Sequence, residues 1–247
     1  MQVVHTHRTS AGFVEISLED NGARNMFSPA LVEGLRRAFA DLVDDVAVKV
    51  VVVRGYDNYF CCGGTRAELL RFADGKAGFA DLDFYRILLD CPIPTIAAMQ
   101  GHALGGGLAF GCYADMLVLA EESVYAANFM RYGFTPGMGA TYILPKRFGD
   151  TIGSEMLWTA RGYRGRQLRE RGVQVPVVKR SDVVPAARAL AAELSERPRA
   201  SLVLLKERLN AEIKRALPAV IAAESRMHEV TFALPEVRAR ITDMRPE

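Results

Sequence analysis

The sequence predicts one α/β domain that continues into a helical C-terminal part. Two observations support this. Short apolar runs alternate with segments of helical period as far as residue 150, and the chain from Gly149 onward is almost entirely of helical period. Half of the 247 residues are hydrophobic, which is ample for a substantial core. We therefore expect a stacked α/β core followed by helices.

The first expected elements are a strand, a helix and a second strand. Residues 13–18 alternate enough to form a strand. Ser28 followed by Pro29 is typical of a helix start, with serine as the N-cap and proline in the first helical position. The nearly continuous apolar run Val48 to Val53 indicates a strand buried on both faces. The apolar stripe of the helix comprises Leu31, Leu35, Ala38, Phe39 and Leu42.

The following elements surround a Gly-rich turn, Leu104-Gly105-Gly106-Gly107. Residues 55–64 are expected to form a loop, and helical segments are expected on either side of residues 74–78. Cys91-Pro92 stops the second of these helices, because proline disfavours the helical conformation of the residue before it. Further strands are expected at 95–99, 116–119 and 175–178, with a helix directly after the Gly-rich turn.

Composition excludes several classes of protein. The 31 Lys and Arg nearly balance the 29 Asp and Glu, which argues against a nucleic-acid binder. No apolar run approaches the roughly 20 residues that span a bilayer, and the first ten residues lack a signal-peptide core, so we expect a cytoplasmic protein without membrane contact. No His/Cys cluster has metal-site spacing, and we expect neither a metal nor a cofactor. The cysteines are expected to be partly buried thiols: Cys61, Cys62, Cys91 and Cys112.

Two glycine-containing loops follow apolar runs, at residues 60–64 and 101–107. Ligands gather at the carboxyl ends of strands in α/β sheets, and successive glycines leave amide hydrogens accessible there. Such donors suit a carbonyl oxygen that becomes negative in a transition state. A glycine triplet alone also fits tight helix–strand packing. A Walker-type phosphate loop is excluded because no Gly-Lys-Ser/Thr follows, and the spacing does not match GxGxxG.

The wider context of the turn carries a family resemblance. Residues 93–107 resemble the signature of enoyl-CoA hydratases and isomerases, the crotonase superfamily. Further matches follow in chain order at 25–28, 60–64, Asp115 and 134–141, so the resemblance covers roughly residues 10 to 235. It implies a crotonase-type spiral of ββα units acting on CoA or carrier-protein thioesters. It also implies a homotrimer or hexamer, with residues 1–190 as the core and 191–247 as a helical trimerisation region. Carried over by position, Gly64 and Gly106 are the backbone donors of the oxyanion hole.

The sequence departs from this family at the two glutamates that hydratases use. Ala109 and Phe129 stand at the matching positions. Neither side chain exchanges protons, and hydration requires a positioned acid or base. Ordinary hydratase or isomerase chemistry therefore loses support, although it stays open as an alternative, as does a non-catalytic protein of crotonase fold.

The segments around residues 91–111 and 125–141 resemble one subgroup, the decarboxylating enzymes of polyketide β-branching cassettes. This resemblance implies conversion of a 3-methylglutaconyl-type carrier-protein thioester to a 3-methylcrotonyl-type product through a dienolate. It implies Lys76 and His228 as the catalytic groups in place of the glutamates. Some members carry a tyrosine where this chain has Phe72, so any hydroxyl role is absent here.

Substrate contacts are expected from Phe72, His102, Ala109 and Phe129, although a structural role for His102 is favoured. The stretch Arg161 to Arg180 is strongly basic and contains Glu170 as its one acidic residue besides many arginines. It is a candidate docking face for an acidic acyl carrier protein. A solvated surface or a subunit contact explains it equally well.

Overall fold

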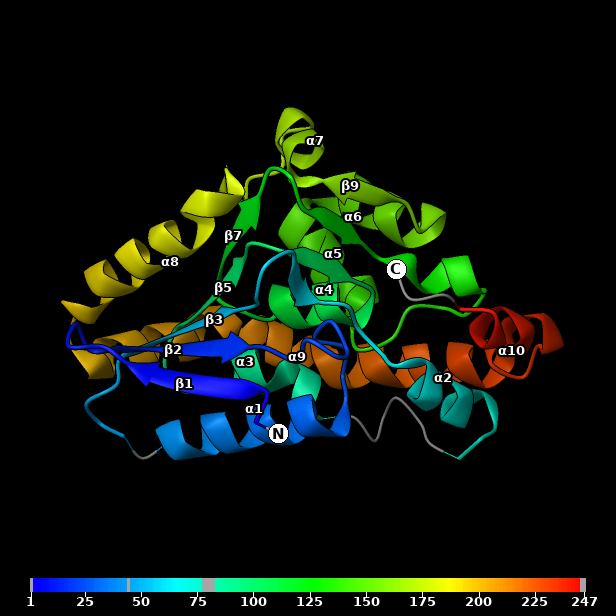
Figure 1. The fold of residues 1–247 in the computed structure, drawn as a ribbon, viewed down its shortest axis with the longest axis horizontal. Coiled ribbons are helices and arrows are strands. Elements are labelled where there is room, and N and C mark those ends of the chain that lie inside the picture. The colour runs from blue at the N-terminus through cyan, green and yellow to red at the C-terminus, as the bar shows by residue number, and fades with distance from the viewer. Residues whose placement is uncertain (1, 44, 77–82, 245–247) are drawn as a thin grey trace.

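The computed structural model describes residues 2–43, 45–76 and 83–244 (Figure 1). Its strands form two sheets. The six-stranded sheet has the order β1-β2-β3-β5-β7-β10, and the four-stranded sheet has the order β4-β6-β8-β9. The strands are β1 (Val4–Arg8), β2 (Phe13–Leu18), β3 (Val50–Arg54), β4 (Tyr59–Cys61), β5 (Thr95–Met99), β6 (His102–Leu104), β7 (Met116–Ala120), β8 (Val124–Ala126), β9 (Gly162–Arg164) and β10 (Val177–Val178).

The helices follow or surround these strands. In the first part of the chain they are α1 (Pro29–Val43), α2 (Arg66–Ala73), α3 (Ile87–Asp90), α4 (Gly106–Cys112), α5 (Ala140–Phe148) and α6 (Asp150–Thr159), with the 3-10 turns η2 (Phe84–Arg86) and η3 (Asn128–Tyr132). The later helices are α7 (Gly165–Glu170), α8 (Arg180–Ser195), α9 (Arg199–Thr231) and α10 (Pro235–Thr242).

The larger sheet is covered on both faces, as its valine-rich strands predict. Only β1 runs antiparallel to its neighbour; the other pairs of this sheet are parallel. Along β3, Val50 and Val52 pack in one apolar cluster with α8, whereas Val51 and Val53 belong to the main core with α1. Alternate side chains of a strand point to opposite faces, so one continuous apolar run contributes to two cores.

The smaller sheet contains strands of only three residues, and these were not expected from the sequence. β4 lies inside residues 55–64, which were predicted to be a loop, and β6, β8 and β9 were missed as well. Three residues are too few to show a period of two, so pairing with neighbours alone reveals them. A strand of the large sheet, a short strand and a helix follow one another as β3-β4-α2 and again as β5-β6-α4. The expected ββα architecture with a helical C-terminal part is confirmed.

Several predicted boundaries agree with the structure. The first helix begins at Pro29, and Ser28 Oγ accepts a hydrogen bond from the Leu31 amide at 3.1 Å. The long helix α9 runs across the lower half of the view, and α10 packs beside α2 (Figure 1). Residue 190, the expected boundary of the helical region, lies inside α8. Within the described part of the chain, no helix combines the length and apolarity that membrane crossing requires.

Candidate active site

The two glycine-containing loops lie side by side because β4 and β6 are neighbouring parallel strands. Tyr59 pairs with His102 and Cys61 with Ala103, so both chains leave the sheet at the same edge. A methyl group added to Gly63 would lie 2.7 Å from the Leu104 carbonyl oxygen and 3.1 Å from the amide nitrogen of the second residue of the glycine triplet. The backbone of one loop therefore passes directly against the start of α4.

Asn25 fixes the first of these loops. Its Nδ2 donates to the carbonyl oxygens of Leu18, at 2.8 Å, and Phe60, at 3.0 Å. The residue is fully buried and has a φ of +52°, in the left-handed region that asparagine tolerates better than most residues. Two residues later, the Phe27 amide donates to Gly63 O at 2.7 Å. The motif at residues 25–28 thus holds the loop that ends in Gly64.

Glycine is required at two positions of the second loop. Gly105 has φ +52° and ψ −121°, and a side chain there would lie 2.6 Å from Asn128 Oδ1. A methyl group on Gly107 would lie 2.1 Å from the Cys61 carbonyl oxygen. Gly105 and Gly107 thus let the backbone turn and approach β4. Gly106, which lies between them in the sequence, lines a cavity. In the described part of the chain, no acceptor is bonded to the amides of Gly64 and Gly106.

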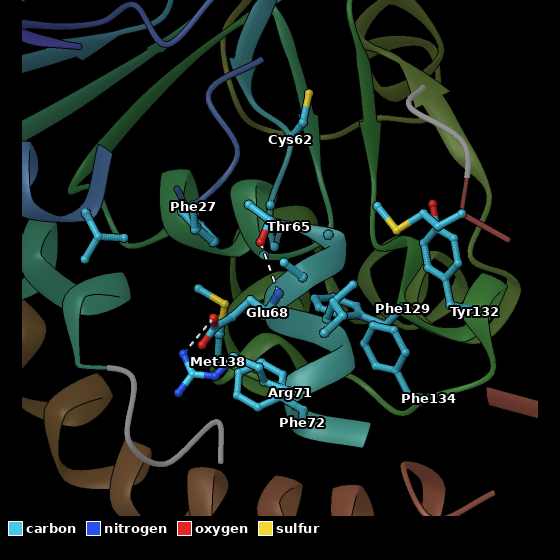
Figure 2. A pocket seen from close by; sticks show the side chains of 18 of the residues that line it. Phe27, Cys62, Thr65, Glu68, Arg71, Phe72, Phe129, Tyr132, Phe134 and Met138 are labelled. Carbon is cyan, nitrogen blue, oxygen red and sulfur yellow. Dashed lines mark hydrogen bonds and ion pairs between the residues drawn. The ribbon is translucent and has the colours of Figure 1, made fainter. Parts of the chain in front are cut away.

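A cavity of about 380 Å³ has both Gly64 and Gly106 among its lining residues (Figure 2). Its wall is mainly apolar and comes from the start of α1, from α2, from η2, from the η3 region and from the turn before α5. The lining includes Phe27, Val32, Gly64, Leu69, Phe72, Phe84, Gly106, Phe129, Phe134 and Met138. Amide donors at the wall of an apolar space act in a low dielectric, where a developing negative charge on a carbonyl oxygen gains most from them.

The structure adds charged residues that the sequence did not single out. Glu68 and Arg71 line the cavity from α2 and form an ion pair at 3.3 Å. Arg36 of α1 lines it as well and pairs with Asp83 at 2.5 Å. Their helical positions were visible in the sequence, but which face of α2 looks into the cavity depends on how that helix packs over the sheet.

The positions of the hydratase glutamates differ in their surroundings. Phe129 lines the cavity and is 3% exposed, and its ring meets that of Phe134 edge-on at 6.1 Å. Ala109 is fully buried in α4 and is absent from the cavity wall, whereas Phe72 lines the cavity. An aromatic wall therefore stands where a hydratase would place one of its carboxylates.

Lys76 lies directly after the end of α2, in a Schellman motif. The amide of Gly75, with φ +67°, donates to Phe72 O at 3.0 Å, and the amide of Lys76 donates to Arg71 O at 2.8 Å. This motif explains the Phe72-to-Lys76 sequence: glycine supplies the left-handed residue that ends the helix. The Lys76 side chain is exposed, and its Nζ lies 3.4 Å from Asp74 Oδ2 rather than in the cavity.

His228 is buried in α9 and stands behind the cavity wall. Its Nε2 lies 2.9 Å from Thr135 O; since a carbonyl only accepts, this nitrogen is the donor. Burial lowers the pKa of His228, although the backbone hydrogen bonds at Thr135 and Pro136 oppose that effect. Its ring meets Phe232 edge-on at 5.5 Å, and Phe232 stacks on Phe134 of the wall at 4.8 Å. Neither Lys76 nor His228 lines the cavity in this structure.

His102 lies apart from the cavity and has a structural contact. Its Nδ1 accepts a hydrogen bond from the Val124 amide at 2.9 Å, which joins β6 to the edge of β8. Burial, followed by the positive charges of Arg180 and Arg164, lowers the pKa of His102, so it is neutral near pH 7. This agrees with the structural role favoured for it.

The basic stretch 161–180 forms β9, α7, β10 and the start of α8, and none of its residues lines the cavity. Part of its charge is neutralised by acidic residues from elsewhere. Arg169 pairs with Glu121, and Arg171 pairs with Glu155 at 2.7 Å. These ion pairs favour a structural role for Arg169 and Arg171. Docking of a carrier protein at this stretch stays a prediction.

The comparisons with known proteins define the class. A family model described as enoyl-CoA hydratase/isomerase matches residues 8–243, and the chain belongs to this family. Within it, the chain is similar to decarboxylases. The bacillaene synthase decarboxylase PksI of Bacillus subtilis is 46% identical over 239 residues, which are 97% of this chain and 96% of PksI.

Two solved structures agree with that relative. The ECH2 decarboxylase domain of CurF from Lyngbya majuscula is 44% identical with a TM-score of 0.94, over 98% of this chain and 99% of that one. A structure described as a dehydratase/decarboxylase enzyme couple of polyketide β-branching is 46% identical with a TM-score of 0.96, over 98% and 96%. The predicted decarboxylating, lyase-type member of the crotonase superfamily is confirmed by these relatives.

Proposed function

We propose that this protein removes CO2 from a 3-methylglutaconyl-type thioester on the phosphopantetheine arm of an acyl carrier protein, and forms a 3-methylcrotonyl-type product. One observation carries the proposal. Gly64 and Gly106 line an apolar cavity whose wall has Phe129 where hydratases place a glutamate. This site stabilises an oxyanion and lacks one of the carboxylates that deliver water in hydratases.

The electron flow needs no additional electron sink. The bond between the γ carbon and the distal carboxylate breaks, and its electron pair moves through the double bond onto the thioester oxygen. CO2 leaves, and the resulting dienolate carries its negative charge where the two amides donate. A proton added at the γ carbon gives the α,β-enoyl product, whereas a proton added at the α carbon gives the β,γ isomer.

Lys76 is proposed to orient the departing carboxylate or to deliver a proton after CO2 leaves. Tight pairing of a cation with the carboxylate would stabilise the ground state more than the transition state, because charge moves away from it. Asp74 holds the Lys76 side chain only weakly, because this side chain is exposed and exposed ion pairs contribute little free energy. The lysine can exchange this partner for the substrate at little cost.

His228 is proposed as the general acid. Burial lowers its pKa, so the imidazole is neutral near pH 7 with its hydrogen on Nε2, which donates to Thr135 O. To act as an acid, the ring must first take up a second proton from solvent at Nδ1; the imidazolium then gives one proton to the dienolate and returns to the neutral form. Delivery also requires the ring to move toward the cavity, and the Phe232 and Phe134 rings connect it to the cavity wall. Substrate binding that shifts these rings would therefore bring the imidazole into reach.

Single-turnover release of CO2 tests these roles. Lys76→Ala and His228→Ala should each reduce the rate at least about 10²-fold, the scale of a lost acid or base. Lys76→Arg and His228→Gln serve as matched variants, and unchanged circular dichroism shows that the fold persists. Rates within about threefold of the unsubstituted protein in both alanine variants would refute the assignment of the two residues.

An isomerase is the alternative that one observation favours. Glu68 places a carboxylate on the cavity wall, although its pairing with Arg71 reduces its use as a base. Formation of a shifted double bond without loss of CO2 would support this alternative.

The same proposal includes a cytoplasmic homotrimer or hexamer in which residues 191–247 form the trimerisation region. Large apolar side chains of α6 and α9 support it, because they are more than half exposed in the isolated chain: Trp158, Leu204, Leu205 and Leu209. Light scattering of the purified protein measures the mass of the assembly, and a monomeric mass would contradict this part of the proposal.

A further inference from the structure

Met138 has an unusual backbone conformation at the cavity wall. Its φ is +62°, in the left-handed region that long side chains adopt rarely. The residue is 3% exposed, and its side chain lines the cavity. A non-glycine residue in this region persists only when its surroundings hold it there, and such residues cluster at functional sites.

Two buried groups hold the two ends of the peptide group that follows Met138. The Tyr113 hydroxyl donates to the Met138 carbonyl oxygen at 2.8 Å. On the other side, Glu224 of α9 is 1% exposed, and its Oε2 accepts from the Gly139 amide at 2.7 Å. Its Oε1 accepts from the Thr141 amide at 2.9 Å and from the Thr141 hydroxyl at 2.6 Å. The peptide group between Met138 and Gly139 is thus fixed at both its carbonyl and its amide.

The direction in which Met138 points follows from this clamp. A methyl group added to Gly106 would lie 2.8 Å from Met138 Sδ and 2.9 Å from Phe27 Cε2. The thioether and the edge of the Phe27 ring therefore lie immediately beside the Cα atom of Gly106, and both residues line the cavity. Figure 2 shows Met138 among the side chains gathered around α2.

We infer that Met138, positioned by Glu224, is a specificity-determining residue that limits the size of the substituent on the β carbon of the acyl chain. This rests on the proposed function. The β carbon is two carbon–carbon bonds, each at most about 1.5 Å, from the carbonyl carbon whose oxygen the amides would hold. Its substituent therefore stays close to these donors, where Met138 and Phe27 are the neighbouring side chains. A methyl branch fits beside them, whereas a longer branch meets the fixed thioether.

The test compares 3-methylglutaconyl and 3-ethylglutaconyl carrier-protein thioesters. In Met138→Ala, the ratio of kcat/KM for the methyl substrate over the ethyl substrate should fall about tenfold or more, since one methylene changes discrimination by roughly 10- to 200-fold. Met156→Ala is the matched control: Met156 is fully buried in α6 and is not part of the cavity lining, so its ratio should stay unchanged. A ratio in Met138→Ala within twofold of the unsubstituted protein would overturn the inference.

Glu224→Gln tests the positioning role. In this variant an NH2 group replaces one carboxylate oxygen, so one backbone N–H loses its acceptor and the turn at Met138 is held less firmly. The methyl-over-ethyl ratio should therefore fall, as in Met138→Ala. Adding Glu224→Gln to Met138→Ala should change the ratio no further, because the glutamate acts through the methionine; an additive change would overturn this part. Should Glu224→Gln fail to fold, Met138→Leu, which keeps the volume, provides the comparison with Met138→Ala.

A binding measurement separates this inference from the proposed function. The saturated 3-methylglutaryl and 3-ethylglutaryl thioesters have no conjugated double bond to accept electrons, so calorimetry reports binding alone. Met138→Ala should improve the relative affinity for the ethyl compound about tenfold, even if the unsubstituted protein releases no CO2. In that event the proposed reaction fails and the specificity assignment stands. Equal relative affinities in both proteins would refute the assignment and leave the reaction untouched.

Discussion

Nζ of Lys76 lies 3.4 Å from Oδ2 of Asp74, so the proposed catalytic cation rests on a carboxylate outside the cavity. The other oxygen of Asp74 accepts hydrogen bonds from Arg238 of α10, at 3.1 and 3.2 Å. Arg238, followed by Lys76, lowers the pKa of Asp74, so this group is ionised near neutral pH. One exposed carboxylate therefore shares its charge between two cations.

This sharing predicts opposite effects for two substitutions. Arg238→Gln removes the competitor for Asp74, holds Lys76 more firmly outside the cavity and should lower kcat/KM. Asp74→Asn releases Lys76 and should leave kcat/KM unchanged or raised. Each change should stay within about two- to fivefold, the scale of an exposed ion pair, and should shrink at high salt. Steady-state kinetics at low and high salt measure both, and a fall in both variants would contradict the shared-carboxylate explanation.

Two neighbouring glycines should respond differently to alanine. In Gly106→Ala, the new methyl meets the ends of two side chains, so the protein should fold but lose about 10²-fold in kcat as the oxyanion site becomes crowded. In Gly107→Ala, the methyl would meet the Cys61 carbonyl oxygen at 2.1 Å, and the backbone cannot yield. That variant should lose most of its thermal stability. Thermal unfolding and turnover distinguish the two; equal unfolding temperatures would contradict this packing argument.

Glu68 should be dispensable for decarboxylation. Glu68→Gln keeps the shape of the side chain and removes its charge, and no step of the proposed reaction uses that carboxylate. CO2 release should stay within about threefold of the unsubstituted protein, whereas the loss of a working acid or base costs 10²-fold or more. A loss of that size would assign acid–base work to Glu68 and revive the isomerase.

Burial of His228 predicts a specific pH dependence of stability. Its pKa in the folded chain lies below the ordinary value of about 6.5, so the unfolded chain binds the proton more readily. The contribution of this residue is present above about pH 6.5 and is lost as the pH falls through that value toward the folded pKa. Urea unfolding between pH 5 and 8 should show a smaller loss of stability at low pH in His228→Gln. An equal loss in both proteins would show that another group is responsible.

The sequence predicted the parts of the fold that carry a period or a boundary residue. The valine run of β3 and the Ser28-Pro29 start of α1 needed no tertiary information. The strands of the small sheet could not be predicted without tertiary information. Three residues such as Tyr59–Cys61 form a strand because of the strands beside them rather than because of their own sequence pattern. A break in the helical pattern at residues 74–78 was expected as well, and α2 ends at Ala73, two residues before Gly75 with its left-handed φ of +67°.

The site was predictable where the backbone carries it. The positions of Gly64 and Gly106 followed from the two loops and the family resemblance, and the structure brings both to one cavity. The side chains that line the cavity were harder to predict from the sequence. Glu68 and Arg71 enter the cavity through the packing of α2, and Glu224 reaches the turn at Met138 from far along the chain. No local pattern reports contacts between segments so distant in sequence.

Decarboxylation is read most directly from the intact mass of a 3-methylglutaconyl carrier protein after incubation with the purified protein. The proposed oxyanion site, with Phe129 in place of a hydratase carboxylate, predicts loss of the mass of one CO2, with no gain of water. The Gly106→Ala variant should slow this loss about 10²-fold. Retention of the carboxylate, or a gain of the mass of water, would contradict the proposed decarboxylation.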